Sequence, residues 1–192
     1  MKYHDPTTSA SDSIQIGLDL KKLKFLMPEI FSLSQRIKYW LRRFGFSSYI
    51  EQISEHISFG DSQGAVVVST SPLLIAAYNE DIDCVIMLKY EKKIQKRYQF
   101  FEGDRLICVN TFGRWEEMQS DLIPGKRNSG SWNSVHPIVA DLVSSDQAPI
   151  QRRKDQIGEQ GFAYIEQLGR EYLIKKPQVF RDGKPIYASM EA

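Results

Sequence analysis

The chain has 192 residues, enough for one domain with its own hydrophobic core. Lysine and arginine total 25 against 24 aspartates and glutamates, and this net charge of +1 argues against a strongly basic nucleic-acid binder and against a disordered acidic tail. Two cysteines are too few for a disulfide-dense scaffold or an all-cysteine zinc site.

The N-terminal dozen residues are polar and rich in serine and threonine. We expect residues 1–12 to be a flexible segment and residues 13–192 to form a single domain. No apolar run follows a basic start, as a secretory signal would require, and no apolar stretch approaches the roughly 20 residues of a membrane span. These features predict a cytoplasmic protein without a membrane partner.

Three elements are predicted before the centre of the chain. Residues 14–20 alternate between apolar and polar, which predicts a half-buried strand, although Gly17 weakens the pattern. Apolar residues then recur at helical spacing after a proline, which predicts an amphipathic helix over 28–44. Residues 47–57 also fit a helix face, though less clearly, and the glycines of 60–64 predict a turn after them.

The centre of the chain is rich in β-branched residues. Short runs separated by turn residues predict four strands, and their short connections favour an antiparallel meander. Because these runs are almost continuously apolar, we expect both faces of the sheet to be covered. The predicted strands are 65–69, 73–78, 84–88 and 106–112.

The last third of the chain begins with an unpatterned stretch over 111–134 and then becomes helical. We predict a short helix over 137–143, a second that starts near Ser144 and breaks at 158–161, and a final one over 162–175. The fold class that follows is α+β, with an antiparallel sheet of about four to six strands packed against amphipathic helices.

His136 is the strongest catalytic candidate among the three histidines. It precedes a predicted helix, and Asp141 follows about one turn later, where it could orient the imidazole. The nucleophile would have to be Cys84, Cys108 or a loop serine brought close by the fold. No G-x-S-x-G sequence marks such a nucleophile, and a histidine near a helix start is more often a structural contact.

Other motifs give weaker signals. The loop 124–131 contains glycine and lysine but lacks the spacing of a phosphate-binding loop, so a solvated loop is favoured over an anion site at Lys126 and Arg127. The histidines and cysteines lack the spacing of metal ligands, and we expect no metal and no cofactor. Two acidic clusters could hold a cation or paired carboxylates, but ordinary turns explain them better. These clusters are Glu80, Asp81 and Asp83, and Glu116, Glu117 and Asp121.

Aromatic and basic residues indicate where a partner could bind. Tryptophans in loops are common anchors for partner proteins, so a binding site is first sought at Trp115, Arg127, Trp132 and His136. Basic residues could form a surface for nucleic acid if the fold gathers them on one face, although solvated helix faces are the simpler explanation. The residues that would have to meet are Lys21, Lys24, Arg42, Arg43, Lys93 and Arg97.

The chain carries no motif that resembles a known family. The sequence therefore favours a non-catalytic domain that binds a protein partner or a second copy of itself, and leaves open whether it binds a small molecule. The main alternative is a hydrolase-type enzyme built at the 113–141 loop around His136. A third possibility is a nucleic-acid accessory protein that uses basic helix faces.

Overall fold

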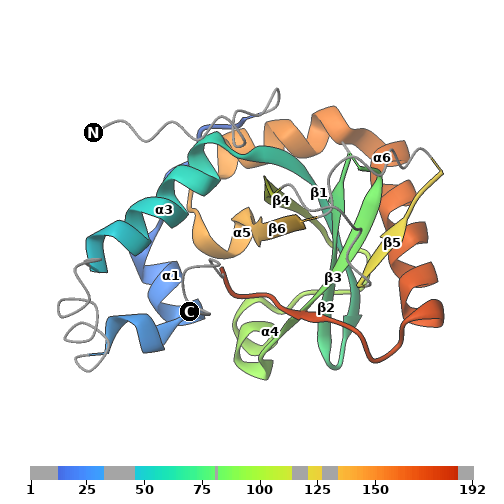
Figure 1. Cartoon of the computed structure of the whole chain (residues 1–192), viewed down its shortest axis with the longest axis horizontal. Helices are drawn as coiled ribbons and strands as arrows, with labels where there is room; N and C mark the ends of the chain where they lie inside the picture. The colour runs from blue at the N-terminus through green and yellow to red at the C-terminus, as the bar shows by residue number, and fades with distance from the viewer. Residues whose placement is uncertain (1–12, 33–45, 81, 114–120, 127–133, 186–192) are drawn as a thin grey trace.

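The computed structural model describes residues 13–32, 46–80, 82–113, 121–126 and 134–185. Within these ranges, helices pack on both faces of an antiparallel sheet, which confirms the predicted α+β class (Figure 1). The predicted segment 1–12 lies outside the described residues. None of the described helices is both long enough and apolar enough to cross a membrane.

The helical elements are α1 (Leu20–Leu26), the 3-10 helix η1 (Pro28–Phe31), α3 (Phe46–Phe59), α4 (Lys92–Tyr98), α5 (Ala140–Val143) and α6 (Gln147–Lys175). The strands are β1 (Asp61–Thr70), β2 (Leu73–Asn79), β3 (Cys84–Tyr90), β4 (Arg105–Gly113), β5 (Leu122–Pro124), β6 (Ser134–Val139) and β7 (Arg181–Asp182). The four strands predicted at the centre are β1 to β4. Helix α4 was not predicted.

The described strands follow the order β5-β3-β2-β1-β4-β6, and β7 pairs with β3 in parallel. Strands β1, β2 and β3 form the predicted meander. After β3 the chain passes through α4 and returns on the other side of β1, so β4 does not continue the meander. Both β2 and β3 have buried side chains along almost their whole length, as expected for strands covered on two faces.

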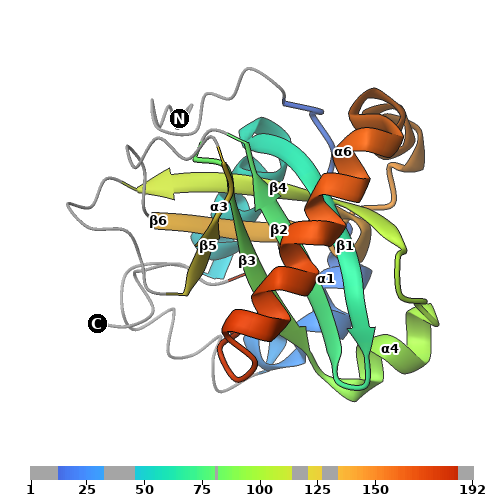
Figure 2. The ribbon, with the colours of Figure 1, turned by 90° about the vertical axis from the view of Figure 1, so that its right-hand side faces the viewer.

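Helix α6 lies across one face of the sheet (Figure 2). The close approach depends on Gly169, because a Cβ atom there would come within 2.7 Å of the Ala76 Cβ and 2.8 Å of the Val68 Cγ1. The predicted break in this helix is confirmed at Gly158, where φ is 65° and ψ is −179°. Gly158 thus lets two helical pieces follow the curved sheet.

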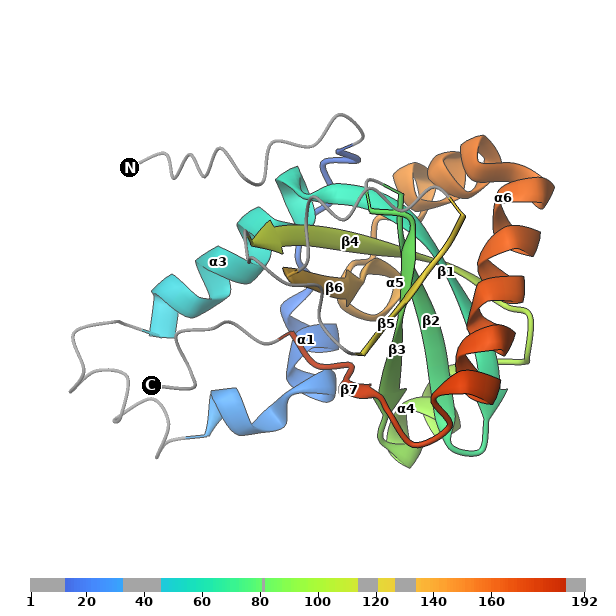
Figure 3. The same ribbon diagram turned by 45° about the vertical axis from the view of Figure 1, so that its right-hand side comes forward.

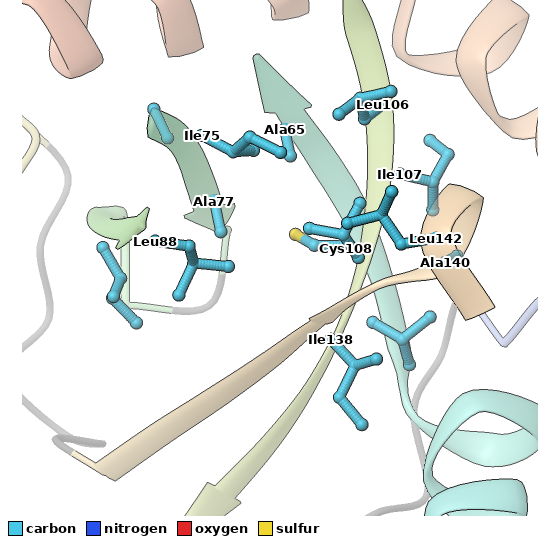
Figure 4. Packing of buried hydrophobic residues seen from close by; sticks show 14 of the residues in the cluster. Ala65, Ile75, Ala77, Leu88, Leu106, Ile107, Cys108, Ile138, Ala140 and Leu142 are labelled. Atoms are coloured by element: carbon cyan, nitrogen blue, oxygen red, sulfur yellow. The ribbon is translucent and has the colours of Figure 1, made fainter. Parts of the chain in front are cut away.

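The opposite face of the sheet is called the inner face here. Its residues come from alternate positions of the strands; α5 packs on β4 beside them (Figure 4), and α1 packs against α5. The labelled members that lie on β1 to β4 and point to this face are Ala65, Ile75, Ala77, Leu88, Leu106 and Cys108. At one end of the inner face the apolar side chains give way to polar ones, as described below.

The predicted strand over 14–20 is wrong. The Gly17 N–H donates to a carboxylate oxygen of Asp146 (2.6 Å) and the Asp19 N–H to the Val143 carbonyl (2.8 Å), so this segment bonds to the end of α5 and the loop after it and not to a strand. Helix α1 begins at residue 20 because the Asp19 carboxylate accepts from the backbone N–H of Lys21 and Lys22.

Of the predicted helix over 28–44, the described residues form the 3-10 helix η1, and Ser32 after it has extended backbone angles. Residues 33–45 lie outside the described residues. The predicted turn over 60–64 is also wrong, because β1 begins at Asp61 and pairs with β4 from that residue on. Its polar residues can join a strand because the neighbouring strand satisfies their backbone groups.

The helix predicted over 137–143 begins three residues later than expected. Residues 134–139 form β6, and Pro137 lies in it opposite Asn110. The residue before a proline favours extended backbone, and a strand at the edge of a sheet tolerates the missing N–H. The helix that follows, α6, has Asp146 as its N-cap, two residues after Ser144, near which its start was predicted.

Arg181 of β7 joins the two outer strands of the sheet, β5 and β6. Figure 3 shows where these three strands lie. Its guanidinium forms a two-pronged ion pair with Asp121, which precedes β5, and donates to the Val135 carbonyl of β6. Burial raises the pKa of Asp121, but the hydrogen bond and charge of Arg181 outweigh it, and the net pKa is lowered. Asp121 is therefore a structural carboxylate.

Candidate functional site

His136 does not lie at the start of a helix. It is half-buried within β6, and its backbone pairs with Thr111 of β4. Trp115, Arg127 and Trp132, the other residues of the predicted binding site, lie outside the described residues.

Asp141 is held away from His136. One carboxylate oxygen accepts from the Lys154 Nζ at 2.6 Å and the other from the Ile107 N–H at 2.8 Å. Ile107 lies four residues along β4 from Thr111, the partner of His136, which is about 13 Å at the rise of a β-strand. The structure therefore does not bring the predicted base and its orienting carboxylate together.

Both cysteines are buried in the sheet, Cys84 on β3 and Cys108 on β4. Burial raises the pKa of each thiol to about 12. Since the thiolate is the nucleophilic form, neither residue is activated for attack at neutral pH.

His56 is a fully buried histidine on α3. Its Nε2 lies 3.1 Å from the Val109 carbonyl oxygen, to which it donates in the tautomer that carries the proton there. Burial lowers the pKa of His56 to about 3, and hydrogen bonds to the backbone of Val109 and His136 offset this only in part. The imidazole is therefore neutral and ties α3 to β4.

The two acidic clusters have structural partners where they are described. Asp83 is buried, and its carboxylate accepts from the Tyr78 hydroxyl at 2.6 Å and from the Tyr164 hydroxyl at 3.1 Å. Asp121 is paired with Arg181, as described above, while Asp81, Glu116 and Glu117 lie outside the described residues. Among the described residues, no group of three or more His, Cys, Asp or Glu side chains is arranged to hold a metal ion.

The described basic residues of the predicted nucleic-acid surface lie on two helices, α1 with Lys21 and Lys24 and α4 with Lys93 and Arg97. Lys93 pairs with Glu91 at 3.0 Å, and the Arg97 guanidinium lies over the Phe25 ring at 4.2 Å. Arg42 and Arg43 lie outside the described residues. The Arg97 contact therefore places α4 beside α1, the helix that carries Lys21 and Lys24.

A cluster of buried polar side chains lies where β1 and β2 separate. Strand β1 pairs with β4 over residues 61–66, but its ladder with β2 ends at Ala65 and Ala77. We call this end the strand fork and define it by residues 61–64 of β1, 78–79 of β2 and 108–110 of β4. Its polar or thiol side chains on the inner face, all at most 4% exposed, are Asp61, Gln63, Asn79, Cys108 and Asn110.

The Tyr78 carbonyl would face β1 if the ladder continued, but β4 side chains bind it instead. The Asn110 Nδ2 donates to this oxygen at 2.8 Å and the Cys108 Sγ at 3.4 Å. In a flat sheet, strands two apart are separated by about 9.5 Å, too far for an asparagine to bridge. The sheet is therefore curled sharply at the fork, so that β4 comes close to β2.

Two polar atoms at the fork remain without a partner among the described residues. They are the Nδ2 of Asn79 and the Oδ1 of Asn110. Their identity is fixed by the other end of each amide, because the Asn79 Oδ1 accepts from the Ile82 N–H at 3.0 Å and the Asn110 Nδ2 donates to the Tyr78 carbonyl. The fork therefore presents one unused donor and one unused acceptor in a buried setting.

A carboxylate lies beside these amides. Asp61 pairs directly with Asn110 across β1 and β4, and its Oδ2 accepts from the Gln63 Nε2 at 2.6 Å. This arrangement can bind polar groups, but it lacks an activated nucleophile, because the pKa of its thiol, Cys108, is raised to about 12.

The fold and the fork carry the functional argument alone. No protein-family model, no curated protein and no solved structure matches this chain.

Sequence reasoning missed the strand fork. Its residues follow a period of two, since Asp61 and Gln63 alternate on β1, and Cys108 and Asn110 alternate on β4. Polar residues at inward positions of neighbouring strands were a usable signal. That signal was hidden because residues 60–64 were assigned to a turn.

Proposed function

We propose that this protein acts by binding and not by catalysis. The observation that supports this most directly is that ionisable and thiol groups in its interior are occupied by structural contacts. The pKa of both thiols is raised to about 12, and that of His56 is lowered to about 3. Asp141 is bound by Lys154 and by a backbone N–H.

Thiol labelling tests this proposal. In the native protein at neutral pH, we expect Cys84 and Cys108 to resist a thiol reagent and to react only after unfolding, because the reactive form is the thiolate. The unfolded chain in denaturant is the control that shows both thiols are intact. Rapid labelling of one thiol in the native state would reveal an activated nucleophile and contradict the proposal.

The partner that we propose is a second copy of the chain, bound through the exposed end of α6. Ile174 is 82% exposed on this helix, and Val179, five residues further on, is 40% exposed. In a twofold contact each apolar side chain is used twice, which doubles what a small patch contributes. Another protein with an apolar surface is the alternative occupant.

Sedimentation equilibrium over a wide concentration range distinguishes these occupants. We expect reversible dimerisation that Ile174→Lys abolishes. Leu20→Lys is the matched control, because Leu20 is also exposed (50%) but lies on α1. A monomer at all concentrations, or a dimer unaffected by Ile174→Lys, would exclude self-association through this surface.

A further inference from the structure

We propose that the strand fork is a binding site for a small neutral molecule with an amide or lactam edge, in which a carbonyl oxygen stands beside an N–H. This site goes beyond the proposed self-association, because it lies between β1, β2 and β4 and not at the end of α6. Three features support it: the two unused polar atoms, the strands that carry them, and the exposed residues at this end of the sheet.

The two atoms define the chemistry of the ligand. The Asn79 Nδ2 offers a hydrogen and the Asn110 Oδ1 offers a lone pair, while the other end of each amide is already bonded. Leaving a buried donor or acceptor unpaired lowers stability, and native interiors seldom contain such groups. A ligand that satisfies both atoms must accept from one and donate to the other.

Asn79 and Asn110 lie on strands that meet at the fork, but their two unused atoms do not pair directly. The Asn110 amide reaches to 2.8 Å from the Tyr78 carbonyl, and Tyr78 immediately precedes Asn79. Each amide is held by its bonded end, so neither can swing to meet the other. An amide or lactam edge presents its oxygen and its N–H side by side, as a bridge between the two would require.

The fork lies at the end of the buried part of the sheet. Glu80 follows Asn79 and is exposed, and Phe59, two residues before Asp61, is 56% exposed. Phe59 and Glu80 therefore mark the exposed side from which a small molecule would approach the fork. Local opening at a strand end requires less free energy than unfolding of the whole sheet.

Titration with acetamide, followed by 1H–15N NMR of the side-chain amides, tests the site in the full chain. We expect saturable shifts of the Asn79 and Asn110 resonances. N,N-dimethylacetamide has the same carbonyl but no N–H, and it should bind about tenfold more weakly, as the loss of one buried hydrogen bond predicts. The Gln95 amide, whose Oε1 also lacks a partner but lies on α4, should not shift.

Variants separate binding at the fork from general effects. Asn79→Leu and Asn110→Leu should each abolish the acetamide shifts of the remaining asparagine, and Gln95→Leu should leave them unchanged. Equal shifts with both amides, no shift in the unaltered protein, or magnetisation transfer to Asn79 and Asn110 from a bound water only would each overturn the proposal. The titration of the unaltered protein decides the question even where a variant does not fold.

Discussion

The two buried polar clusters that meet at β2 differ in how completely their hydrogen bonds are formed. Both involve Tyr78: its hydroxyl points to the α6 face and bonds Asp83, while its carbonyl faces the strand fork. In the Asp83 cluster, two hydroxyls converge on one carboxylate, and the Gly125 N–H donates to the Asp83 carbonyl. At the fork, one donor and one acceptor remain unused.

The difference shows how structural and binding roles can be told apart from the hydrogen bonds of each cluster. A completed cluster stabilises the fold and has little left to offer a ligand. A cluster with unformed hydrogen bonds lacks the stability that these bonds would add, and a bound molecule that forms them restores it. Three measurements of stability test this contrast.

The largest effect is expected from Asp83→Ala, which should lower the free energy of unfolding by about 3 kcal/mol, since it leaves the hydroxyls of Tyr78 and Tyr164 without their acceptor. Urea denaturation measures this change. Asp83→Asn is the control, because asparagine also tolerates the left-handed backbone at this position (φ 43°) and keeps one acceptor. A loss below 1 kcal/mol in Asp83→Ala would mean that the completed cluster is not a stability element.

His56 is expected to make stability depend on pH. Its pKa is about 3 when folded against 6.5 as the ordinary value, so only the unfolded chain takes up the proton between these limits. Stability is therefore complete above pH 6.5 and falls by about 1.4 kcal/mol per pH unit below it, or about 2 kcal/mol by pH 5.

Urea denaturation at several pH values tests this dependence. His56→Gln cannot take up the proton, so its stability should change less over the same interval. The difference between the two slopes isolates the imidazole. Parallel slopes would show that His56 is not buried in its neutral form.

The smallest effect is expected at the fork. Asn110→Leu removes one hydrogen bond to the Tyr78 carbonyl but also removes an unpaired acceptor, so the free energy of unfolding should fall by about 1 kcal/mol or less. The Tyr78 carbonyl keeps the Cys108 thiol as a donor. A loss as large as that of Asp83→Ala would show that the fork is a stability element, and the contrast between the clusters would fail.

Local patterns predicted the centre of the fold because there each residue's preference agrees with its tertiary setting. The β-branched runs became β1 to β4, and Gly158 broke α6 as expected. The alternation over 14–20 predicted a strand wrongly, because the Asp19 side chain caps a helix and periodicity alone does not reveal a cap. Pro137 misled for a similar reason, since it suits an edge strand as well as a helix start.

The candidate site was harder to predict because it depends on curvature. The sequence placed Asn79 in a turn and Asn110 within a strand, and no local pattern indicated that β4 would curl back to the Tyr78 carbonyl. The proposed pairing of His136 with Asp141 assumed that they share a helix start. It was not realised because β6 extends through Val139 and carries His136 along β4.

Because Arg181 comes after β5 and β6 in the chain, its ion pair forms only after the strands that it joins have been made. A chain growing from its N-terminus makes all the strands from β1 to β6 before residue 181 is added. Until then β5 and β6 lack the side chain that fastens them together, and exposed strand edges are where chains mispair. The last described strand thus completes the link between the two outer strands only late in synthesis.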